Sequence, residues 1–399
     1  MINVVLKNNT DIVYGKGSVS RVGDLIREQG GTKVLIHHVS EPFVQPLIDQ
    51  VKEVLTAAGL EYVELGGVVP NPRLSKVYEG IELCRKEGVD FLLAVGGGSV
   101  IDSCKAIAIG VPYDGDVWDF FLMKASHKTA LPVGVISTFA ATGSECTAGT
   151  VITKEDELLK RGVEDSNDNI MIRPRFAILD PTLTFTAPRF QTASGTADII
   201  SHICENYFSV DPDNDFSDHF CEAGLKTAIK FGPVVLNDPQ NYEARGALML
   251  LSGFAINGYM KFGRHGDWNC HALEHEMSGE WDIPHGAGLA IITPHWMRYI
   301  YRDHLPLFLK FATQVFDIPY DADDPEGTAL AGIQALEDVF FRKLGLPRTL
   351  RELGIPQARM TDEILHKVCG QIFYYGTDVV GDLHPMRETD FFTILKQSV

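Results

Sequence analysis

Several kinds of segment are absent from this chain of 399 residues. No stretch approaches the roughly 18 consecutive apolar residues that a membrane-spanning helix needs. The opening stretch, MINVVLKNNTDIVYG, holds no apolar run of signal-peptide length. We find no internal repeat and no low-complexity tract. We therefore expect a soluble, cytoplasmic protein.

Cysteine is scarce and shows no pairing pattern. The 7 cysteines are an odd number, lie far apart and form no C-x-x-C pair. This pattern is typical of reduced thiols in a cytoplasmic protein. Cys270 adjoins His271, but neighbouring side chains on a helix point about 100° apart. We therefore place Cys270 in the core rather than at a metal.

Positive charge is also in short supply. Lys and Arg number 35 against 53 Asp and Glu, which gives a net charge of −18. Such a surface repels phosphate backbones, so we expect no nucleic acid partner. An anionic cofactor can still bind, but only through backbone N–H groups and a few local cations.

The composition is that of a globular protein, with 45% hydrophobic residues, and the length suggests two domains. The first half alternates short β-branched runs with helical patterns, which predicts a parallel sheet with right-handed crossovers. The expected strands are 33–36, 62–65, 90–95, 130–136 and 176–179.

The second half has a different character. From about Thr192 the patterns are long and helical, with no convincing strand. The expected helices are 192–208, 215–231, 241–262, 267–278, 286–302, 305–316 and 326–344. We therefore predict an α/β domain over residues 1–185 and an all-helical domain over residues 186–399. The charged stretch Lys154–Asn169 is predicted to be a solvated surface connection.

Four residues of the helical half form the most informative pattern in the chain. Asp198 and His202 stand 4 positions apart, and His271 and His285 stand 14 apart. Positions i and i+4 share one face of a helix, so Asp198 and His202 can reach one point. One carboxylate and three imidazoles form a suitable ligand set for Zn²⁺ or Fe²⁺. A chance occurrence of helical spacing is the alternative.

A glycine-rich turn, Gly96–Ser99, follows the apolar strand 90–95 and precedes a helical pattern. This order presents backbone N–H groups and a positive dipole end to a phosphate. The turn lacks the G-x-G-x-x-G spacing, and a bare tight turn is the alternative. We favour a pyrophosphate site. Lys105, on the following helix, is either a surface charge or a second cation near that site.

A second loop of small residues, 137–147 (STFAATGSECT), follows the strand 130–136. Its hydroxyls suit ribose and nicotinamide contacts, because ligands bind at the carboxyl ends of parallel strands. The same residues would also satisfy a Ser/Thr-capped helix start. The two interpretations are compatible.

Together these motifs resemble the iron-containing (group III) alcohol dehydrogenase family, and its butanol dehydrogenase-like branch in particular. The matching stretches are 70–108, 132–147, 173–208 and 271–294. The resemblance implies a dehydroquinate synthase-like architecture, in which a Rossmann-like domain is followed by a helical metal-binding domain. It also implies reduction of aldehydes with a nicotinamide cofactor.

The resemblance further implies individual site residues. The implied metal ligands are Asp198, His202, His271 and His285. The implied cofactor contacts are Gly97, Gly98, Ser99, Asp102, Thr138, Thr142, Ser144, Lys160 and Leu179. His275 matches a histidine that lies near the nicotinamide in such enzymes and is a candidate proton relay. A packed, hydrogen-bonded core histidine is the alternative.

Cofactor choice depends on the turn after the strand 33–36, which reads His37-His38-Val39-Ser40-Glu41. It is neither the glycine-rich turn of many butanol dehydrogenase-like relatives nor the Asp turn of NAD-preferring ones. Ser40 and the two histidines could hold a 2′-phosphate, whereas Glu41 could hold a ribose hydroxyl. Because the turn has no Asp, we expect NADP(H) in preference to NAD(H).

These parts predict hydride transfer between NAD(P) and a small primary alcohol or aldehyde, with the metal polarising the substrate oxygen. One alternative is a dehydroquinate synthase-like or glycerol dehydrogenase-like enzyme. The former needs several basic residues near the ligands, where we find only Lys261 and Arg264. A non-catalytic metal or nucleotide sensor is the other alternative.

Assembly is predicted from the start of the chain. Asn3–Leu6 (NVVL) is expected to form a short apolar strand. An open strand edge of this kind invites aggregation, so pairing with a second copy would protect it. We therefore expect at least a homodimer.

Overall fold

The computed structural model describes residues 3–164, 170–211, 214–374 and 376–399. The chain divides into two compact units. The sheet unit comprises residues 5–187 and 252–257, and the helical unit comprises 188–251, 258–399 and the first residues of the chain. Within the described residues, none of the helices combines the length and the apolar character needed to cross a membrane.

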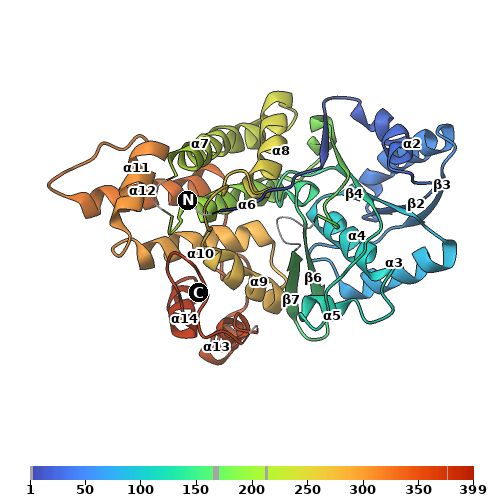
Figure 1. The fold of residues 1–399 in the computed structure, drawn as a ribbon. Coiled ribbons are helices and arrows are strands. Elements are labelled where there is room, and N and C mark those ends of the chain that lie inside the picture. The colour runs from blue at the N-terminus through green and yellow to red at the C-terminus, as the bar shows by residue number, and fades with distance from the viewer. Residues whose placement is uncertain (1–2, 165–169, 212–213, 375) are drawn as a thin grey trace. The chain divides into compact units, whose positions relative to one another are not determined.

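The sheet unit, which includes β2, β3 and β4 of Figure 1, is built on a 6-stranded parallel sheet. Its strands lie in the order β1-β8-β5-β4-β2-β3. Its strands are β1 (Asp11–Tyr14), β2 (Lys33–His38), β3 (Glu61–Leu65), β4 (Phe91–Gly96), β5 (Val133–Ser137) and β8 (Phe176–Leu179). The near-continuous apolar runs of β4, β5 and β8 are buried along their whole length, as parallel strands covered on both faces require. The predicted parallel sheet is confirmed.

Helices cover both faces of this sheet. The helices of one face are α1 (Val22–Glu28) and α2 (Gln45–Ala57), and those of the other are α3 (Leu74–Glu87) and α4 (Gly98–Gly110). Alternate residues of a strand point to opposite faces. Val34 and Ile36 therefore join the apolar cluster beneath α1 and α2, whereas His37 bonds to Ser103 on α4.

The order of the strands locates a ligand site. β2 and β4 are hydrogen-bonded neighbours, although β3 lies between them in the chain. The connection after β2 leads to one edge of the sheet, and the connection after β4 leads toward the other. Ligands of open α/β sheets bind at such a reversal, beyond the carboxyl ends of the strands. The turns after β2 and β4 are therefore where a dinucleotide is expected to bind.

One prediction for the sheet unit is wrong. The stretch after Lys154 is not a solvated connection, because β6 (Gly149–Lys154) and β7 (Leu159–Glu164) form an antiparallel hairpin. Lys160 and Arg161 are buried in it. Their aliphatic stems can pack while the charged ends find polar partners, so charge alone did not reveal the strand. Residues 165–169 of the predicted connection lie outside the described residues.

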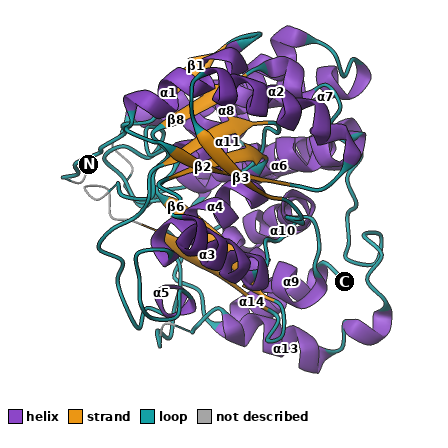
Figure 2. Ribbon diagram, turned by 90° about the vertical axis from the view of Figure 1, so that its right-hand side faces the viewer, coloured by secondary structure: helices purple, strands orange, loops and turns teal. Residues whose placement is uncertain are grey.

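The helical unit contains no strand among its described residues, which confirms the all-helical prediction. Figure 2 distinguishes the helices, in purple, from the strands, in orange. Its longer helices are α6 (Arg189–Tyr207), α7 (Asp215–Asn237), α8 (Tyr242–Ile256), α9 (Asn269–Trp281), α10 (His285–Ile300), α11 (Leu305–Val315), α12 (Pro325–Glu337), α13 (Asp362–Gln371) and α14 (Glu388–Gln397). The last residues of α8, from Ser252, belong to the sheet unit. The predicted helix 326–344 is divided, since a π-helical turn follows α12 over Asp338–Lys343. The pattern did not reveal α13 and α14.

The strand predicted at Asn3–Leu6 is also wrong for the single chain. The described residues 3–6 are not part of any strand, and β1 begins only at Asp11. A strand needs a hydrogen-bonded neighbour, which the apolar alternation of a sequence cannot supply.

Candidate functional site

Three helices bring the four predicted metal ligands together. α6 carries Asp198 and His202 one turn apart, α9 carries His271, and α10 begins at His285. Asp198 Oδ1 lies 3.5 Å from His202 Nδ1, 3.9 Å from His271 Nε2 and 3.6 Å from His285 Nε2. One carboxylate oxygen is thus surrounded by one nitrogen from each of three imidazoles.

The polar atoms at the centre of this group have no hydrogen-bond partner in the described structure. These atoms are Asp198 Oδ1, His202 Nδ1 and His271 Nε2, and all three are buried. Buried polar atoms in folded proteins are nearly always paired. A divalent cation would satisfy all of them at once, and a carboxylate with imidazoles is a donor set that suits Fe²⁺ or Zn²⁺.

Two buried glutamates orient the imidazoles. His271 Nδ1 donates to Glu205 on α6, and His285 Nδ1 donates to Glu274 on α9. A proton held at Nδ1 leaves the lone pair at Nε2, on the side that faces Asp198. Both glutamates are fully buried, with 0% exposed surface. The sequence prediction missed them, although Glu205 lies 7 positions after Asp198 on the same helix face.

Glu205 also forms the start of α9. The residue before this helix, Trp268, provides no side-chain cap. Instead Glu205 Oε1 accepts hydrogen bonds from Cys270 N at 2.6 Å and His271 N at 3.3 Å. A carboxylate is stabilised at a helix N-terminus because the first N–H groups are unpaired and the dipole is positive there.

Gly286 allows α10 to approach α6. A Cβ at this position would overlap the carbonyl oxygen of Ser194 and would lie 3.2 Å from the Asp198 Cβ. The backbone of α6 cannot move aside as a flexible side chain could. The Pro284-His285-Gly286 turn therefore brings His285 to Asp198 because position 286 has no side chain.

Burial and mutual charge set the ionisation of the group. Burial alone would raise the pKa of Asp198, but the surrounding imidazoles hold it well below its usual range. Burial lowers the pKa of His202 to about 3. Burial also opposes a charge on His271, but Glu205 and Asp198 outweigh this effect and raise its pKa to about 9. The group therefore favours one positive charge next to Asp198.

His275 lies beside the ligand group. Its ring centroid is 6.3 Å from that of His271 and 5.5 Å from that of His285. Together with Glu274 and His285 it forms a further set of possible ligand atoms. Glu274 already holds His285, so we interpret this set as support for the first group. His275 is half-buried at the edge of the site, where a proton could pass.

The glycine-rich turn of the sheet unit lies between a strand and a helix, as predicted. β4 ends at Gly96 and α4 begins at Gly98, and the N-cap residue, Gly97, provides no side-chain cap. The first N–H groups of a helix have no partner within the helix, and here they are available to an anion. A Cβ at Gly98 would overlap the Thr142 side chain. The missing side chain thus lets the second small-residue loop approach the turn.

Asp102 and Lys105 fix this second loop. Asp102 Oδ1 accepts from Ser144 Oγ at 2.5 Å, and its Oδ2 accepts from Val151 N at 3.2 Å. Lys105 Nζ donates to carbonyl oxygens of Ser144 and Gly149, each at 2.7 Å. Lys105 is completely buried, so its interpretation as a surface charge is wrong. Both residues position the loop through its backbone and hydroxyls.

The other predicted cofactor residues belong to the same unit. Thr138 follows β5 directly, where its N–H donates to Gly96 O at 3.1 Å. Leu179 ends β8 opposite Ser137 and is buried, as is Lys160 in β7. Ser40, after β2, is exposed. The structure thus gathers Thr138 and Thr142 at the carboxyl ends of β4 and β5.

The two histidines of β2 already have partners. His37 is fully buried, with Nδ1 2.8 Å from Leu65 O and Nε2 2.9 Å from Ser103 Oγ. His38 Nε2 lies 3.0 Å from Glu64 Oε1. Burial lowers the pKa of His37 to about 4, so this imidazole is neutral at pH 7. A role for these histidines in holding a 2′-phosphate is therefore not supported.

Acid should destabilise the sheet unit through His37. The unfolded imidazole binds a proton near pH 6.5, whereas the folded one does so only near pH 4. Stability is therefore lost as pH falls from 6.5 to 4, by about 3 kcal/mol for this group. Urea unfolding at pH 7 and pH 4.5 measures the loss. The loss should be smaller in His37→Asn, and an unchanged loss would contradict the assignment.

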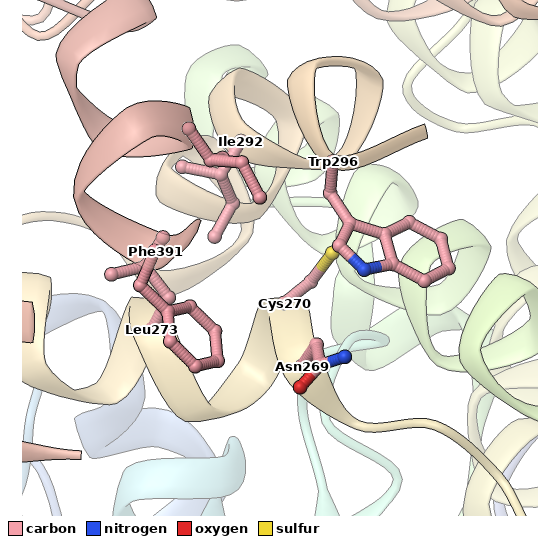
Figure 3. A pocket seen from close by; sticks show the side chains of 7 residues that line it. Asn269, Cys270, Leu273, Ile292, Trp296 and Phe391 are labelled. Atoms are coloured by element: carbon pink, nitrogen blue, oxygen red, sulfur yellow. The ribbon is translucent and has the colours of Figure 1, made fainter. Parts of the chain in front are cut away.

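An apolar hollow lies behind the start of α9, and none of the four ligands lines it. Its walls come from α9, α10 and α14 and include Cys270, Leu273, Ile292, Trp296 and Phe391 (Figure 3). Cys270 is buried here, in the core, as predicted. Burial raises the pKa of its thiol well above the ordinary value, so we assign it a packing role.

Comparison with known proteins agrees with this geometry. The family model "iron-containing alcohol dehydrogenase" matches residues 9–181, and "Fe-containing alcohol dehydrogenase family, C-terminal" matches 192–376. The probable NADH-dependent butanol dehydrogenase 1 of Bacillus subtilis is 39% identical over 399 residues, with full coverage of both chains. The NADPH-dependent aldehyde reductase YqhD of Escherichia coli is 33% identical, covering 89% of this chain and 90% of its own.

A solved structure shows the same fold over the whole length. The NADH-dependent butanol dehydrogenase A of Thermotoga maritima superposes with a TM-score of 0.93 and 37% identity, covering 100% of this chain and 99% of its own. The resemblance noted from the sequence motifs is thereby confirmed. The chain belongs to the iron-containing alcohol dehydrogenase family and is an oxidoreductase of that class.

Proposed function

We propose that this protein moves hydride between a nicotinamide dinucleotide and a small primary alcohol or aldehyde. The observation that carries the proposal is the convergence of three imidazoles on Asp198 Oδ1, with central atoms that are buried and unpaired. A sheet with a glycine turn at its strand reversal supplies the dinucleotide site.

We assign the metal to Asp198, His202, His271 and His285. Such an ion supplies Lewis-acid polarisation of the substrate oxygen. The chain's contribution is orientation, since Glu205 and Glu274 each hold a proton at the Nδ1 of one imidazole. His275, half-buried beside His271 and His285, is assigned as the relay that passes the alcohol proton to solvent.

The dinucleotide is assigned to the sheet unit. The N–H groups of Gly97, Gly98 and Ser99 would hold the pyrophosphate at the start of α4. Thr138 and Thr142, at the carboxyl ends of the strands, would contact ribose and nicotinamide. Asp102 and Ser144 would position the loop rather than contact the cofactor directly, because the Ser144 hydroxyl is hydrogen-bonded to Asp102 and Lys105. Lys160 and Leu179 complete the assigned contacts.

For the choice of dinucleotide we propose NAD(H). The sequence prediction of NADP(H) depended on a turn able to hold a 2′-phosphate, and the histidines of that turn are already bonded. Glu41, exposed after β2, would repel a phosphate and accept from a ribose hydroxyl. The Bacillus subtilis relative is named for NADH, whereas the Escherichia coli relative is named for NADPH.

Steady-state reduction of butanal with each cofactor tests both proposals. We expect kcat/KM for NADH to exceed that for NADPH by about tenfold or more, the value of one unfavourable charge contact. Glu41→Gln should reduce the ratio of kcat/KM for NADH to that for NADPH. A preference for NADPH would contradict the cofactor assignment, and no turnover with either cofactor would contradict the proposed reaction.

We also propose an assembly of at least two copies. Residues 3–6 form no strand in the single chain, and Val5 is 63% exposed. Pairing with a second copy would cover this apolar segment and complete its backbone hydrogen bonds. Sedimentation equilibrium at micromolar protein is expected to give a mass of at least twice 44.1 kDa. A single species at the monomer mass would refute the proposal.

The dehydroquinate synthase-like alternative is not favoured. It requires basic side chains free to hold an anionic substrate, and one of the two candidates is already paired. Arg264 is 3% exposed and donates to Asp218 Oδ1 at 2.6 Å.

A further inference from the structure

Trp268 has a backbone conformation that a tryptophan rarely adopts. Its φ is 60° and its ψ is 14°, in the left-handed region. A bulky residue is strained there, since its Cβ crowds the following carbonyl oxygen. Such strain persists only where neighbouring structure imposes it, and it clusters at ligand sites. Trp268 directly precedes α9, the helix of the ligand His271.

Hydrogen bonds on both sides impose this conformation. Asp267 N donates to Glu205 O at 3.0 Å, and Asp267 Oδ1 accepts from Leu383 N at 2.7 Å. On the other side, Asn269 Nδ2 donates to His384 O at 3.0 Å and to Asp267 Oδ2 at 2.6 Å. The backbone at 267–269 is therefore tied to α6 and to the loop 383–384, and Trp268 cannot relax.

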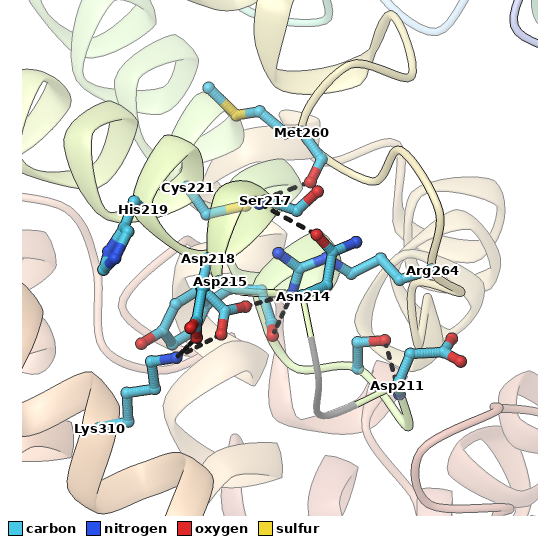
Figure 4. Close-up of polar contacts among 12 residues, drawn as sticks. Asp211, Asn214, Asp215, Ser217, Asp218, His219, Cys221, Met260, Arg264 and Lys310 are labelled. Atoms are coloured by element: carbon cyan, nitrogen blue, oxygen red, sulfur yellow. Dashed lines mark hydrogen bonds and ion pairs between the residues drawn. The ribbon is translucent and has the colours of Figure 1, made fainter. Parts of the chain in front are cut away.

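The segment leading to Trp268 is anchored as well (Figure 4). Phe262 O accepts from Asn214 Nδ2 at 2.8 Å and from Ser217 Oγ at 3.0 Å. Arg264 adds the buried pair with Asp218 described above. Contacts at two separate points thus hold the segment before Trp268 against the start of α7.

The indole lies against two of the ligand imidazoles. Its ring centroid is 5.3 Å from that of His271, at an angle of 66°, and 6.1 Å from that of His202. Lys261 Nζ also lies over the indole, 5.5 Å from its centroid. Trp268 is half-buried, whereas His202 and His271 are buried.

The site therefore has two half-exposed flanks. Side-chain exposure rises from 2% at Asp198 through 4% at His202 and 9% at His271 to 19% at His285. Trp268 lies beside His202 and His271, and His275 lies beside His271 and His285. The indole of Trp268 and the imidazole of His275 are therefore two half-buried rings next to the ligand group, and each contacts a different pair of its imidazoles.

We propose that Trp268 is a specificity-determining residue whose indole limits the length and branching of the alcohol or aldehyde chain. The proposal builds on the proposed function, since it requires a substrate at the metal. Because hydrogen bonds of Asp267 and Asn269 fix the backbone on both sides, the backbone of Trp268 cannot move aside to make room for a larger chain. Short unbranched substrates fit beside it, and longer or branched ones meet the indole.

Substrate profiles of two variants test this proposal. Trp268→Gly removes the indole and also suits a positive φ, so it carries little risk of misfolding. Trp268→Phe keeps a smaller aromatic ring. We expect the ratio of kcat/KM for 3-methylbutanal to that for propanal to rise by about tenfold or more in Trp268→Gly, and by less in Trp268→Phe. An unchanged ratio would overturn the proposal.

Trp281→Phe is the matched control. Trp281 is the last residue of α9, the helix that Trp268 precedes; it is buried and donates through Nε1 to Arg359 O at 3.0 Å. This change should lower stability without altering the substrate ratio. An equal rise in the ratio in Trp281→Phe would also overturn the proposal, because it would show a general loosening of α9.

A spectroscopic measurement separates this proposal from the metal assignment. Co²⁺ quenches a nearby indole, so titrating the metal-free protein with Co²⁺ should reduce tryptophan fluorescence. Trp268→Phe should lose most of this quenching, whereas Trp281→Phe should retain it. Absence of quenching in the unaltered protein would overturn the metal site itself. Equal quenching in both variants would overturn only the placement of Trp268.

Discussion

His202→Ala is expected to lower kcat for aldehyde reduction by about a thousandfold or more, because Lewis-acid polarisation contributes several kcal/mol to the reaction. His202 supplies one of the nitrogens that surround Asp198 Oδ1. Dinucleotide binding should change little, since the Gly96–Ser99 turn belongs to the other compact unit. Elemental analysis, turnover and calorimetric titration with NADH measure these three effects.

Two other histidines provide controls for this experiment. His265 is exposed and pairs with Asp211, and His295 lies on α10 outside the ligand group. Alanine at either position should lower kcat far less than His202→Ala does. Near-normal activity of His202→Ala in metal-stripped buffer would contradict the metal assignment.

Glu205→Ala is expected to affect both metal affinity and stability. Loss of the carboxylate that holds His271 Nδ1 should weaken metal binding about 10- to 100-fold. The N–H groups of Cys270 and His271 would also lose a buried acceptor. This loss should lower the free energy of unfolding by about 1–3 kcal/mol. Competitive Zn²⁺ titration and urea unfolding measure the two effects.

Glu280→Ala is the matched comparison. Glu280 is a buried glutamate like Glu205, but it lies on α9 and its partners are Arg359 and Lys367. Its loss should reduce stability while leaving metal affinity unchanged. If Glu205→Ala also leaves metal affinity unchanged, Glu205 does not orient the ligand.

The convergence of Asp198, His202, His271 and His285 could be predicted from sequence because their relation is partly local. Asp198 and His202 share a helix face by spacing alone, and the Pro-His-Gly turn distinguishes His285. Glu205 and Glu274 could not be predicted in the same way. Their roles arise when α9 and α10 pack on α6, and in the sequence a buried glutamate looks like a solvated one.

Other differences have the same cause. Lys105 is buried because the loop 144–149 folds over it with several acceptor oxygens, a contact between residues about 40 positions apart. The sequence of β7 does not predict a strand because it contains charged residues, and these are accommodated when β7 pairs with β6. From the sequence His37 is a possible phosphate ligand, but in the structure both of its ring nitrogens already have partners, Leu65 O and Ser103 Oγ.

Glu205 and Glu274 differ in how many groups they bind, and this difference affects any redesign of the site for another metal. Both carboxylates set the basicity of an imidazole, and through it the preference among ions. Glu205 also accepts hydrogen bonds from the first N–H groups of α9. A substitution there would therefore disturb the start of this helix as well as the protonation of His271. Glu274 lies inside α9, where it also accepts a hydrogen bond from the Ser278 hydroxyl. Libraries that aim to exchange the metal should therefore vary position 274 first and keep position 205 fixed.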